Sequence, residues 1–236
     1  MAKGKTELLP LCSGTLISPT VFLTAGHCTE FLIKEDLPTY VSFDPTYKPG
    51  ASKLIRGTPY IHPKQCLAVK KGCVPDPIGG SVVGYPRYDV GVVVLNKPVR
   101  MATYGALPEV GLVDTLKEGQ RLTAVGYGTT GFARGDSRLP LPVYPDDRYR
   151  ATVRLLNTKD PALGEMFVKT TGVKGLIKRE GEGTCFGDSG GPLFLPDQQT
   201  IVGVTSWGST VPPCTGPAYY QRMDLPRVLK WVRSFP

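Results

Sequence analysis

Short runs of β-forming residues, each closed by a turn that contains glycine or proline, recur along this chain and constrain its fold. Its 236 residues include 28 glycines and 23 prolines, and long helical periodicities are scarce. This pattern is typical of an all-β protein in which tight turns join many short strands, and β-barrels of this length often form one domain. We expect two strands around a Ser-Pro turn within 12–28 and further strands at 39–43, 53–57, 88–95, 121–128, 150–156, 201–208 and 218–223.

One convincing helix is expected, at the C-terminal end of the chain. It runs from Leu225 to Phe235, and Asp224 is suited to its N-cap. Its apolar stripe, which would face the core, consists of Val228, Leu229 and Val232.

The six cysteines predict up to three disulfides. Cys12 and Cys28 fit a local bridge between neighbouring strands, which would fix a tight turn expected at 25–28. Cys66 and Cys73 would staple a segment of loop composition that begins at 61. A metal site is the alternative, but the chain has two histidines and no Cys-x-x-Cys word, so we expect neither metal nor cofactor.

Cysteine usage also bears on location, because disulfides persist in oxidising compartments. We therefore expect a secreted or periplasmic protein. No apolar signal core follows the first five residues, so we expect an export leader that this sequence does not include. If the chain begins here naturally, the argument for export is weaker.

The charge pattern is that of a solvated surface. The net charge is +8, yet Lys and Arg are scattered and no basic run interleaves with aromatic residues. No stretch is long enough to span a membrane. We therefore expect no nucleic-acid or membrane partner.

The stretch from Gly183 to Pro192 sets Ser189 among glycines and is the first candidate for chemistry. Glycines allow backbone conformations in which peptide N–H groups converge, and such groups stabilise the oxyanion that forms when a serine attacks a carbonyl. Taken alone, the stretch fits an ordinary glycine-rich turn equally well.

A nucleophilic serine needs a base, and the base needs a third group that holds its tautomer. His27 follows an expected strand, and Asp89 opens another. An aspartate in such a place usually caps a turn, but a buried aspartate needs a partner, which a catalytic histidine would supply. His62 is the rival base; it precedes Pro63 in a loop-like stretch, and we expect it to be non-catalytic.

The short sequence motifs around these residues resemble those of the chymotrypsin-like (trypsin-fold) serine proteases. The matches are Leu-Thr-Ala-Gly-His-Cys at 23–28, Tyr-Asp-Val at 88–90 and Gly-Asp-Ser-Gly-Gly-Pro at 187–192, with weaker ones at 126–128 and 206–208. The resemblance implies a single domain over 1–236, built from two six-stranded antiparallel β-barrels (about 1–105 and 106–236), a C-terminal helix and a site in the cleft between the barrels.

The resemblance also implies roles for individual residues. Ser189 would be the nucleophile, His27 the general base and Asp89 the group that orients it. The N–H groups of Gly187 and Ser189 would form the oxyanion hole. Three further residues, Ser206, Trp207 and Gly208, would pair with the substrate backbone, Ser206 also lying near Asp89, and a disulfide Cys185–Cys214 would brace the specificity pocket.

Side-chain preference follows from the pocket floor, which the resemblance places at Gly183, beside Thr184. A basic side chain would want a paired acid there, and Gly183 offers none. Gly208 would keep the mouth open and Ala218 would narrow the wall slightly, which favours an apolar or aromatic side chain before the scissile bond. The alternative is a basic preference restored by Glu180 or Glu182.

One departure from the family concerns the residue before the nucleophile, Asp188. In the family's active form this aspartate pairs with a freed N-terminal ammonium, but no Ile-Val-Gly-Gly word precedes Cys12. The amine of Met1, Lys3, Lys5 or hydrogen-bonding neighbours could substitute.

Three hypotheses follow for the function. The first is an active, secreted, monomeric endopeptidase that acts on polypeptides and that protein inhibitors could bind. The second is an inactive protease-fold binding protein whose Asp188 switch is unset. The third is an esterase-like hydrolase with the same triad.

Overall fold

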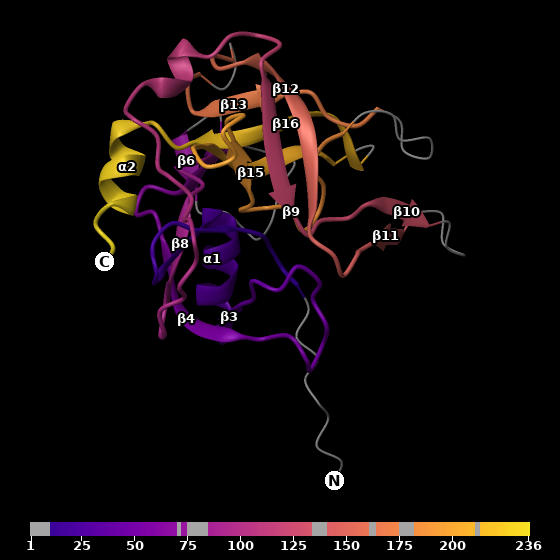
Figure 1. The fold of residues 1–236 in the computed structure, drawn as a ribbon. Coiled ribbons are helices and arrows are strands. Elements are labelled where there is room, and N and C mark those ends of the chain that lie inside the picture. The colour runs from indigo at the N-terminus through magenta and orange to yellow at the C-terminus, as the bar shows by residue number, and fades with distance from the viewer. Residues whose placement is uncertain are drawn as a thin grey trace.

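The chain forms a five-stranded antiparallel sheet followed by a closed six-stranded barrel (Figure 1). The structure is a computed structural model, and it describes residues 10–69, 72–74, 85–133, 141–160, 164–174, 182–210 and 213–236. The sheet has the strand order β1-β2-β8-β4-β3. Its strands are β1 (Thr15–Leu16), β2 (Val21–Thr24), β3 (Thr39–Val41), β4 (Ile55–Ile61) and β8 (Gly91–Leu95).

The second half closes on itself in the order β12-β13-β16-β15-β14-β9. Its strands are β9 (Arg121–Gly126), β12 (Tyr149–Asn157), β13 (Phe167–Thr170), β14 (Pro192–Phe194), β15 (Ile201–Thr210) and β16 (Pro213–Arg222). All its pairings are antiparallel, which confirms the all-β class and the barrel expected for this half.

The first half differs from the six-stranded barrel that we expected. β1 is two residues long, and β3 pairs with β4 alone. Over the described residues this half is therefore a five-stranded half-barrel sheet.

A shared apolar core holds the sheet, the barrel and the C-terminal helix together. Val21 and Val92 of the sheet are in one buried cluster with Ile201 and Val204 of the barrel, and Val228 of the helix completes it. Burial of each such side chain contributes about 1.5–3 kcal/mol, so the two halves are fixed against each other where the site lies.

Two helices are present where one was expected. α1 (Gly26–Lys34) replaces the tight turn predicted at 25–28, and the i,i+4 ion pair Lys34–Glu30 lies along it. The start of α1 was not predicted because the Ala-Gly sequence follows a strand and glycine has a low helix propensity. α2 (Pro226–Val232) confirms the C-terminal helix and lies at the left of the barrel in Figure 1.

The N-cap expected for α2 was wrong. Leu225 occupies that position, while Asp224 is fully buried and directs its carboxylate elsewhere. It accepts hydrogen bonds from the Val113 N–H and from the guanidinium of Arg222. An ion pair inside the protein thus replaces a helix cap.

Strands also occupy the segment expected to be loop. β5 (Cys66–Val69), β6 (Gly72–Val74) and β7 (Tyr85–Arg87) form a small sheet in the order β6-β5-β7. Elsewhere, β10 (Gly131–Ala133) pairs with β11 (Leu141–Val143), and η1 (Leu112–Thr115) is a 3₁₀ turn. No helix in the described part of the chain has the length and apolar character needed to cross a membrane.

Two of the three expected disulfides are confirmed, Cys12–Cys28 and Cys185–Cys214. Cys66 is disulfide-bonded as well. The side chain of Cys73 lies outside the described residues, so the pairing Cys66–Cys73 stays a prediction.

Candidate active site

Strand pairing brings His27 and Asp89 together. β2 and β8 are antiparallel, with Thr24 opposite Gly91, so the end of one strand meets the start of the other. His27 follows β2 in the first turn of α1, and Asp89 precedes β8. His27 Nδ1 lies 2.9 Å from Asp89 Oδ2, and the His27 peptide N–H donates to Oδ1 at 2.8 Å.

This contact assigns the tautomer of His27. An ionised carboxylate can only accept hydrogen bonds, so the proton lies on Nδ1. Nε2 then carries the lone pair, which is the form of the ring that can act as a base. The side chain of His27 is 17% exposed, which leaves the ring accessible to a reactant.

Asp89 is fully buried, yet its carboxylate is well satisfied. Ser206 Oγ donates to Oδ2, in addition to the two donors from His27. Burial raises the pKa of Asp89, but the charge of His27 and the hydrogen bonds from His27 and Ser206 together hold that pKa below its ordinary value. Asp89 is therefore ionised at neutral pH.

The turn that carries Ser189 is fixed by backbone hydrogen bonds. The Ser13 N–H donates to Ser189 O at 2.7 Å, and the Gly190 N–H donates to Thr205 O at 2.8 Å. Gly187 and Gly190 have φ values of +94° and +83°, which residues with a side chain rarely adopt. Gly190 also approaches the end of β2 so closely that a Cβ there would lie 2.8 Å from the Ala25 nitrogen.

Ser189 therefore lies beside the residues that precede His27. Its carbonyl oxygen is 3.9 Å from Cys28 Sγ, and the sulfurs of Cys12 and Cys28 lie within 4.8 Å of a ring nitrogen of His27. The described residues show no hydrogen bond between Ser189 Oγ and His27. Contacts between nucleophile and base are often long before substrate binds.

The cluster Cys12, His27 and Cys28 has the composition of a metal site. Its two sulfurs are bonded to each other, however, so they do not supply the thiolates that zinc prefers. The donor set does not fit a metal.

Gly187 and Ser189 are the residues whose N–H groups are expected to form the oxyanion hole. Within the described chain, the N–H groups of Gly187 and Ser189 donate to no protein acceptor. The carbonyl of Gly187 is held by Ser13 Oγ at 2.8 Å, and Ser13 Oγ in turn accepts from the Tyr127 N–H at 3.0 Å. Ser13 thereby fixes the orientation of Gly187.

The carboxylate of Asp188 accepts hydrogen bonds from two backbone N–H groups. The Gly128 N–H donates to Oδ1 and the Cys185 N–H to Oδ2, each at 2.9 Å. A Cβ on Gly128 would lie 2.3 Å from Oδ2, so glycine is required there. A cavity of about 220 Å³ adjoins this carboxylate, while Met1, Lys3 and Lys5 lie outside the described residues.

The predicted pocket floor and wall are apolar or neutral. A Cβ on Gly183 would lie 2.9 Å from the Cα of Gly172, so the chain passes close behind it. Thr184 Oγ1 is 3.5 Å from the hydroxyl of Tyr220, and burial raises the pKa of Tyr220 to about 12. Ala218 is buried and packs in the core of the barrel.

Of the two acids that could restore a basic preference, Glu182 lines the cavity of about 220 Å³ together with Gly183 and Thr184. The carboxylate of Glu182 accepts a hydrogen bond from the Thr152 N–H of β12. Glu180 lies outside the described residues.

Ser206, Trp207 and Gly208 lie together in β15, as expected. The ring of Trp207 stacks on Tyr219 with 4.0 Å between ring centroids, which stiffens the strand pair β15–β16. Ser206 is buried beside Asp89, whereas Trp207 and Gly208 are half-buried.

Two contributors had no local signal in the sequence. Ser13 is 174 residues away from Gly187, and Gln221 is 132 residues away from Asp89, whose N–H it accepts at 3.0 Å. Neither Ser13 nor Gln221 lies in a recognisable motif, so their roles become apparent only from the contacts that the fold creates.

Known proteins are similar to this chain in sequence and in fold. The family model for trypsin matches residues 2–232. Spermosin of Halocynthia roretzi is 30% identical over 88% of this chain, which spans 50% of that protein, and glucanase inhibitor protein 2 of Phytophthora sojae is 25% identical over 94% of this chain and 68% of its own length. Among solved structures, neuropsin, a serine protease expressed in the limbic system of mouse brain, superposes with a TM-score of 0.65 at 21% identity, over 95% of this chain and 88% of that one.

Proposed function

The chain belongs to the trypsin family of serine proteases, and we propose that it is a serine endopeptidase that uses Ser189, His27 and Asp89. The observation that supports this most is the buried, ionised Asp89 held against His27 Nδ1. Burying an ionised carboxylate costs desolvation free energy, and a histidine with a purely structural role does not require such a partner.

In the proposed reaction, Ser189 Oγ attacks the carbonyl carbon of the scissile peptide bond while its proton passes to His27 Nε2. Asp89 stabilises the imidazolium that results, and the N–H groups of Gly187 and Ser189 donate to the oxyanion. His27 then protonates the leaving amine, which leaves an ester on Ser189. Water then attacks this ester while its proton passes to His27 Nε2; the bond between the acyl carbon and Ser189 Oγ breaks as His27 returns the proton to Oγ, and the acid product departs.

The proposed substrates are polypeptides with an apolar or aromatic residue before the scissile bond. Gly183 itself brings no charge to the pocket floor, and the carboxylate of the nearby Glu182 accepts a hydrogen bond from the Thr152 N–H. In β15, residues 206–208 would pair with the substrate backbone as an added strand. We also propose a single secreted or periplasmic domain that acts as a monomer, in keeping with its disulfides.

Hydrolysis of peptide amides tests this proposal. Matched substrates with Phe, Leu, Lys or Arg before the scissile amide should give a higher kcat/KM for the apolar pair, and Ser189→Ala should abolish turnover of all four. Equal or higher turnover of the Lys and Arg substrates would refute the apolar preference. Turnover of esters with the same side chains, without turnover of the amides, would indicate an esterase.

A second candidate is a binding protein with a protease fold. The similarity to a protein whose name describes a glucanase inhibitor favours keeping it. Under this alternative the folded, oxidised protein hydrolyses neither amides nor esters, and the substitution Ser189→Ala does not change its affinity for its binding partner.

A further inference from the structure

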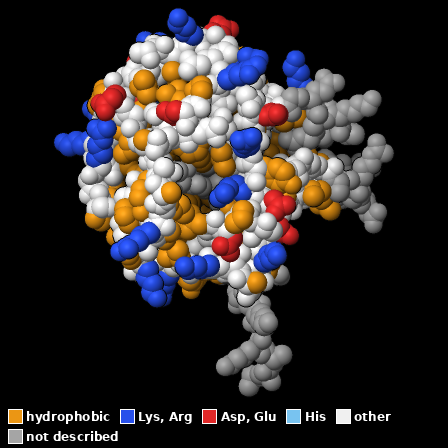
Figure 2. All heavy atoms as spheres, viewed as in Figure 1, with side chains coloured by type: hydrophobic (Ala, Val, Ile, Leu, Met, Phe, Trp, Pro, Cys, Tyr) orange, Lys and Arg blue, Asp and Glu red, His pale blue; other side chains and the backbone are white. Residues whose placement is uncertain are grey.

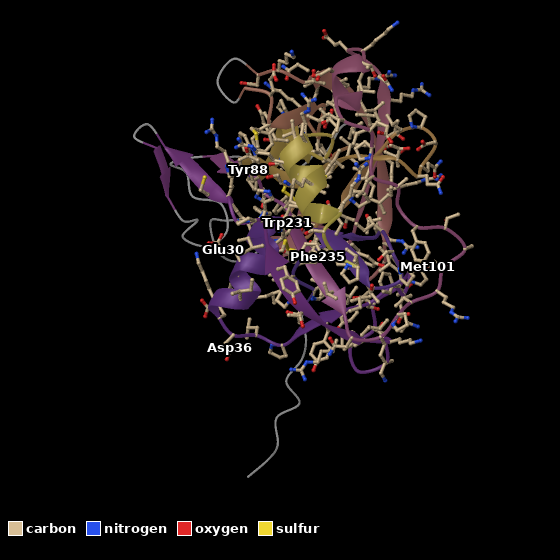
Figure 3. The ribbon with its side chains drawn as sticks, turned by 90° about the vertical axis from the view of Figure 1, so that its left-hand side faces the viewer. Glu30, Asp36, Tyr88, Met101, Trp231 and Phe235 are labelled. Carbon is tan, nitrogen blue, oxygen red and sulfur yellow. A yellow bond between two sulfur atoms is a disulfide. The ribbon has the colours of Figure 1, made fainter. Side chains whose placement is uncertain are left out.

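A groove of about 450 Å³ lies outside the active site, between the segment 62–64 and one face of α2. The groove is lined from the helix by Arg227, Lys230 and Trp231. Ser234, which follows the C-terminal end of α2, lines it as well. The opposite face of α2 is buried in the core. Figure 3 shows this side of the molecule, with α2 toward the viewer and Trp231 near Tyr88.

The floor of this groove is formed by the rings of His62 and Trp231, which pack on further aromatic rings. The ring of His62 stacks on Tyr88 with 4.8 Å between centroids and meets Trp231 edge-on at 5.1 Å. Trp231 continues to Phe235, and Phe235 to the exposed ring of Tyr60. An apolar side chain seated here would therefore contact a preformed surface and order little of the protein.

His62 is buried to 4% exposure and belongs to this floor rather than to the active site. Its Nδ1 accepts the Lys64 N–H at 3.2 Å, and the backbone of Arg227 hydrogen-bonds the ring. Burial lowers the pKa of His62, and the charge of Lys64 lowers it further against the effect of that backbone bond. The floor is therefore uncharged at neutral pH.

The rim of the groove is cationic. Lys64, Arg227 and Lys230 are exposed, and none of them forms an ion pair with any part of the chain that the structure describes. The nearby acid Glu30 is already engaged by Lys34 and by Gln65. Elsewhere Lys and Arg are interspersed among other side chains, as Figure 2 shows for the face seen in Figure 1.

We propose that this groove, defined by residues 62–64 and the exposed face of α2, binds an acidic peptide segment that carries an aromatic or aliphatic side chain. The three unpaired cations complement carboxylates, and the aromatic floor accepts the apolar side chain between them. A sulfated polysaccharide or nucleic-acid backbone would satisfy the rim and leave the floor unused. The groove contains no atom of the proposed triad, so the inference does not depend on catalytic activity.

Binding of a fluorescein-labelled peptide of Asp and Glu residues around one central Phe tests the groove. Fluorescence anisotropy is measured with the Ser189→Ala protein, so that the peptide stays intact. Replacing Lys64, Arg227 and Lys230 together by Ala should weaken binding at least about tenfold, and added salt should weaken it in the parent protein. A peptide with Ser in place of Phe should also bind at least about tenfold more weakly, because the floor is then unfilled.

The matched control replaces two Lys and one Arg elsewhere, Lys97, Arg100 and Lys117, which are exposed. Met101, the neighbour of Arg100, lies well away from Trp231 in Figure 3. The control should bind the peptide within about twofold of the parent, because long-range charge is screened. Equal binding by both triple variants, or no effect of the Phe-to-Ser exchange, would overturn the proposal. Tighter binding of a heparin fragment or single-stranded DNA than of the peptide at this groove would also overturn it.

Discussion

Ser13→Ala should lower the turnover number while leaving substrate affinity nearly unchanged. Ser13 is 4% exposed; it donates to Gly187 O at 2.8 Å and accepts the Tyr127 N–H at 3.0 Å. Alanine removes both contacts. The peptide of Gly187, whose N–H is proposed to receive the oxyanion, then loses the group that orients it.

The size of the effect follows from these two hydrogen bonds. The carbonyl of Gly187 and the N–H of Tyr127 are half-buried, and leaving them without partners costs about 2 kcal/mol together, which lowers Tm by about 4–8 °C in a domain of this size. Outright loss of one oxyanion donor costs about 10²- to 10³-fold in kcat. Because Ser13→Ala misorients the donor without removing it, we expect kcat to fall by about 10- to 100-fold.

The assay separates catalysis from stability. kcat and KM are measured on a peptide amide well below the Tm of each variant. The control is Tyr104→Phe, because Tyr104 Oη likewise donates to one carbonyl (Val99) and accepts one N–H (Met101). The control should lower Tm with unchanged kcat. A Ser13→Ala protein with lowered Tm and the kcat of the parent would refute the proposed role of Ser13.

Three further predictions concern the charged interior. Asp89→Asn places an amide opposite His27 Nδ1 and forces the wrong tautomer, so kcat for a peptide amide should fall by about 10⁴, the loss known for this exchange in the chymotrypsin template; a loss under about tenfold would contradict the triad. Because the pKa of Asp89 lies below its ordinary 3.8, its ionised form stabilises the fold above that pH, and this contribution is lost as pH falls through the folded-state pKa. Thermal melts from about pH 5 to pH 2 should therefore show a smaller loss of Tm for Asp89→Asn than for the parent, and parallel losses would disprove this. Arg222→Met leaves Asp224 buried without its ion pair and should lower the urea-unfolding free energy by about 3–5 kcal/mol, whereas an unchanged midpoint would show that Asp224 does not need it.

Sequence alone predicted those parts of the molecule whose signals are local. The words around His27, Asp89 and Ser189 placed each residue at a strand end or glycine turn, and the structure brings His27 and Asp89 into contact. The barrel strands were predictable because β-forming runs alternate with turn residues.

The remainder depends on contacts between distant segments. α1 was missed because Gly26 follows a strand and has low helix propensity, whereas packing of Cys28 and Thr29 against the sheet favours the helix. Asp224 resembles an N-cap until Arg222 and Val113 are seen beside it. Similarly, Lys64 and Arg227 form a common rim only once the fold brings α2 against residue 62.

Covalent labelling by a fluorophosphonate tests the central claim most directly. The reagent forms a stable phosphonyl ester only with a serine that is activated by a base and supported by an oxyanion hole. We predict one adduct by intact mass, located on Ser189 by peptide mapping, and none in Ser189→Ala. A folded, oxidised protein that remains unlabelled would contradict the proposed nucleophile and favour the binding-protein alternative.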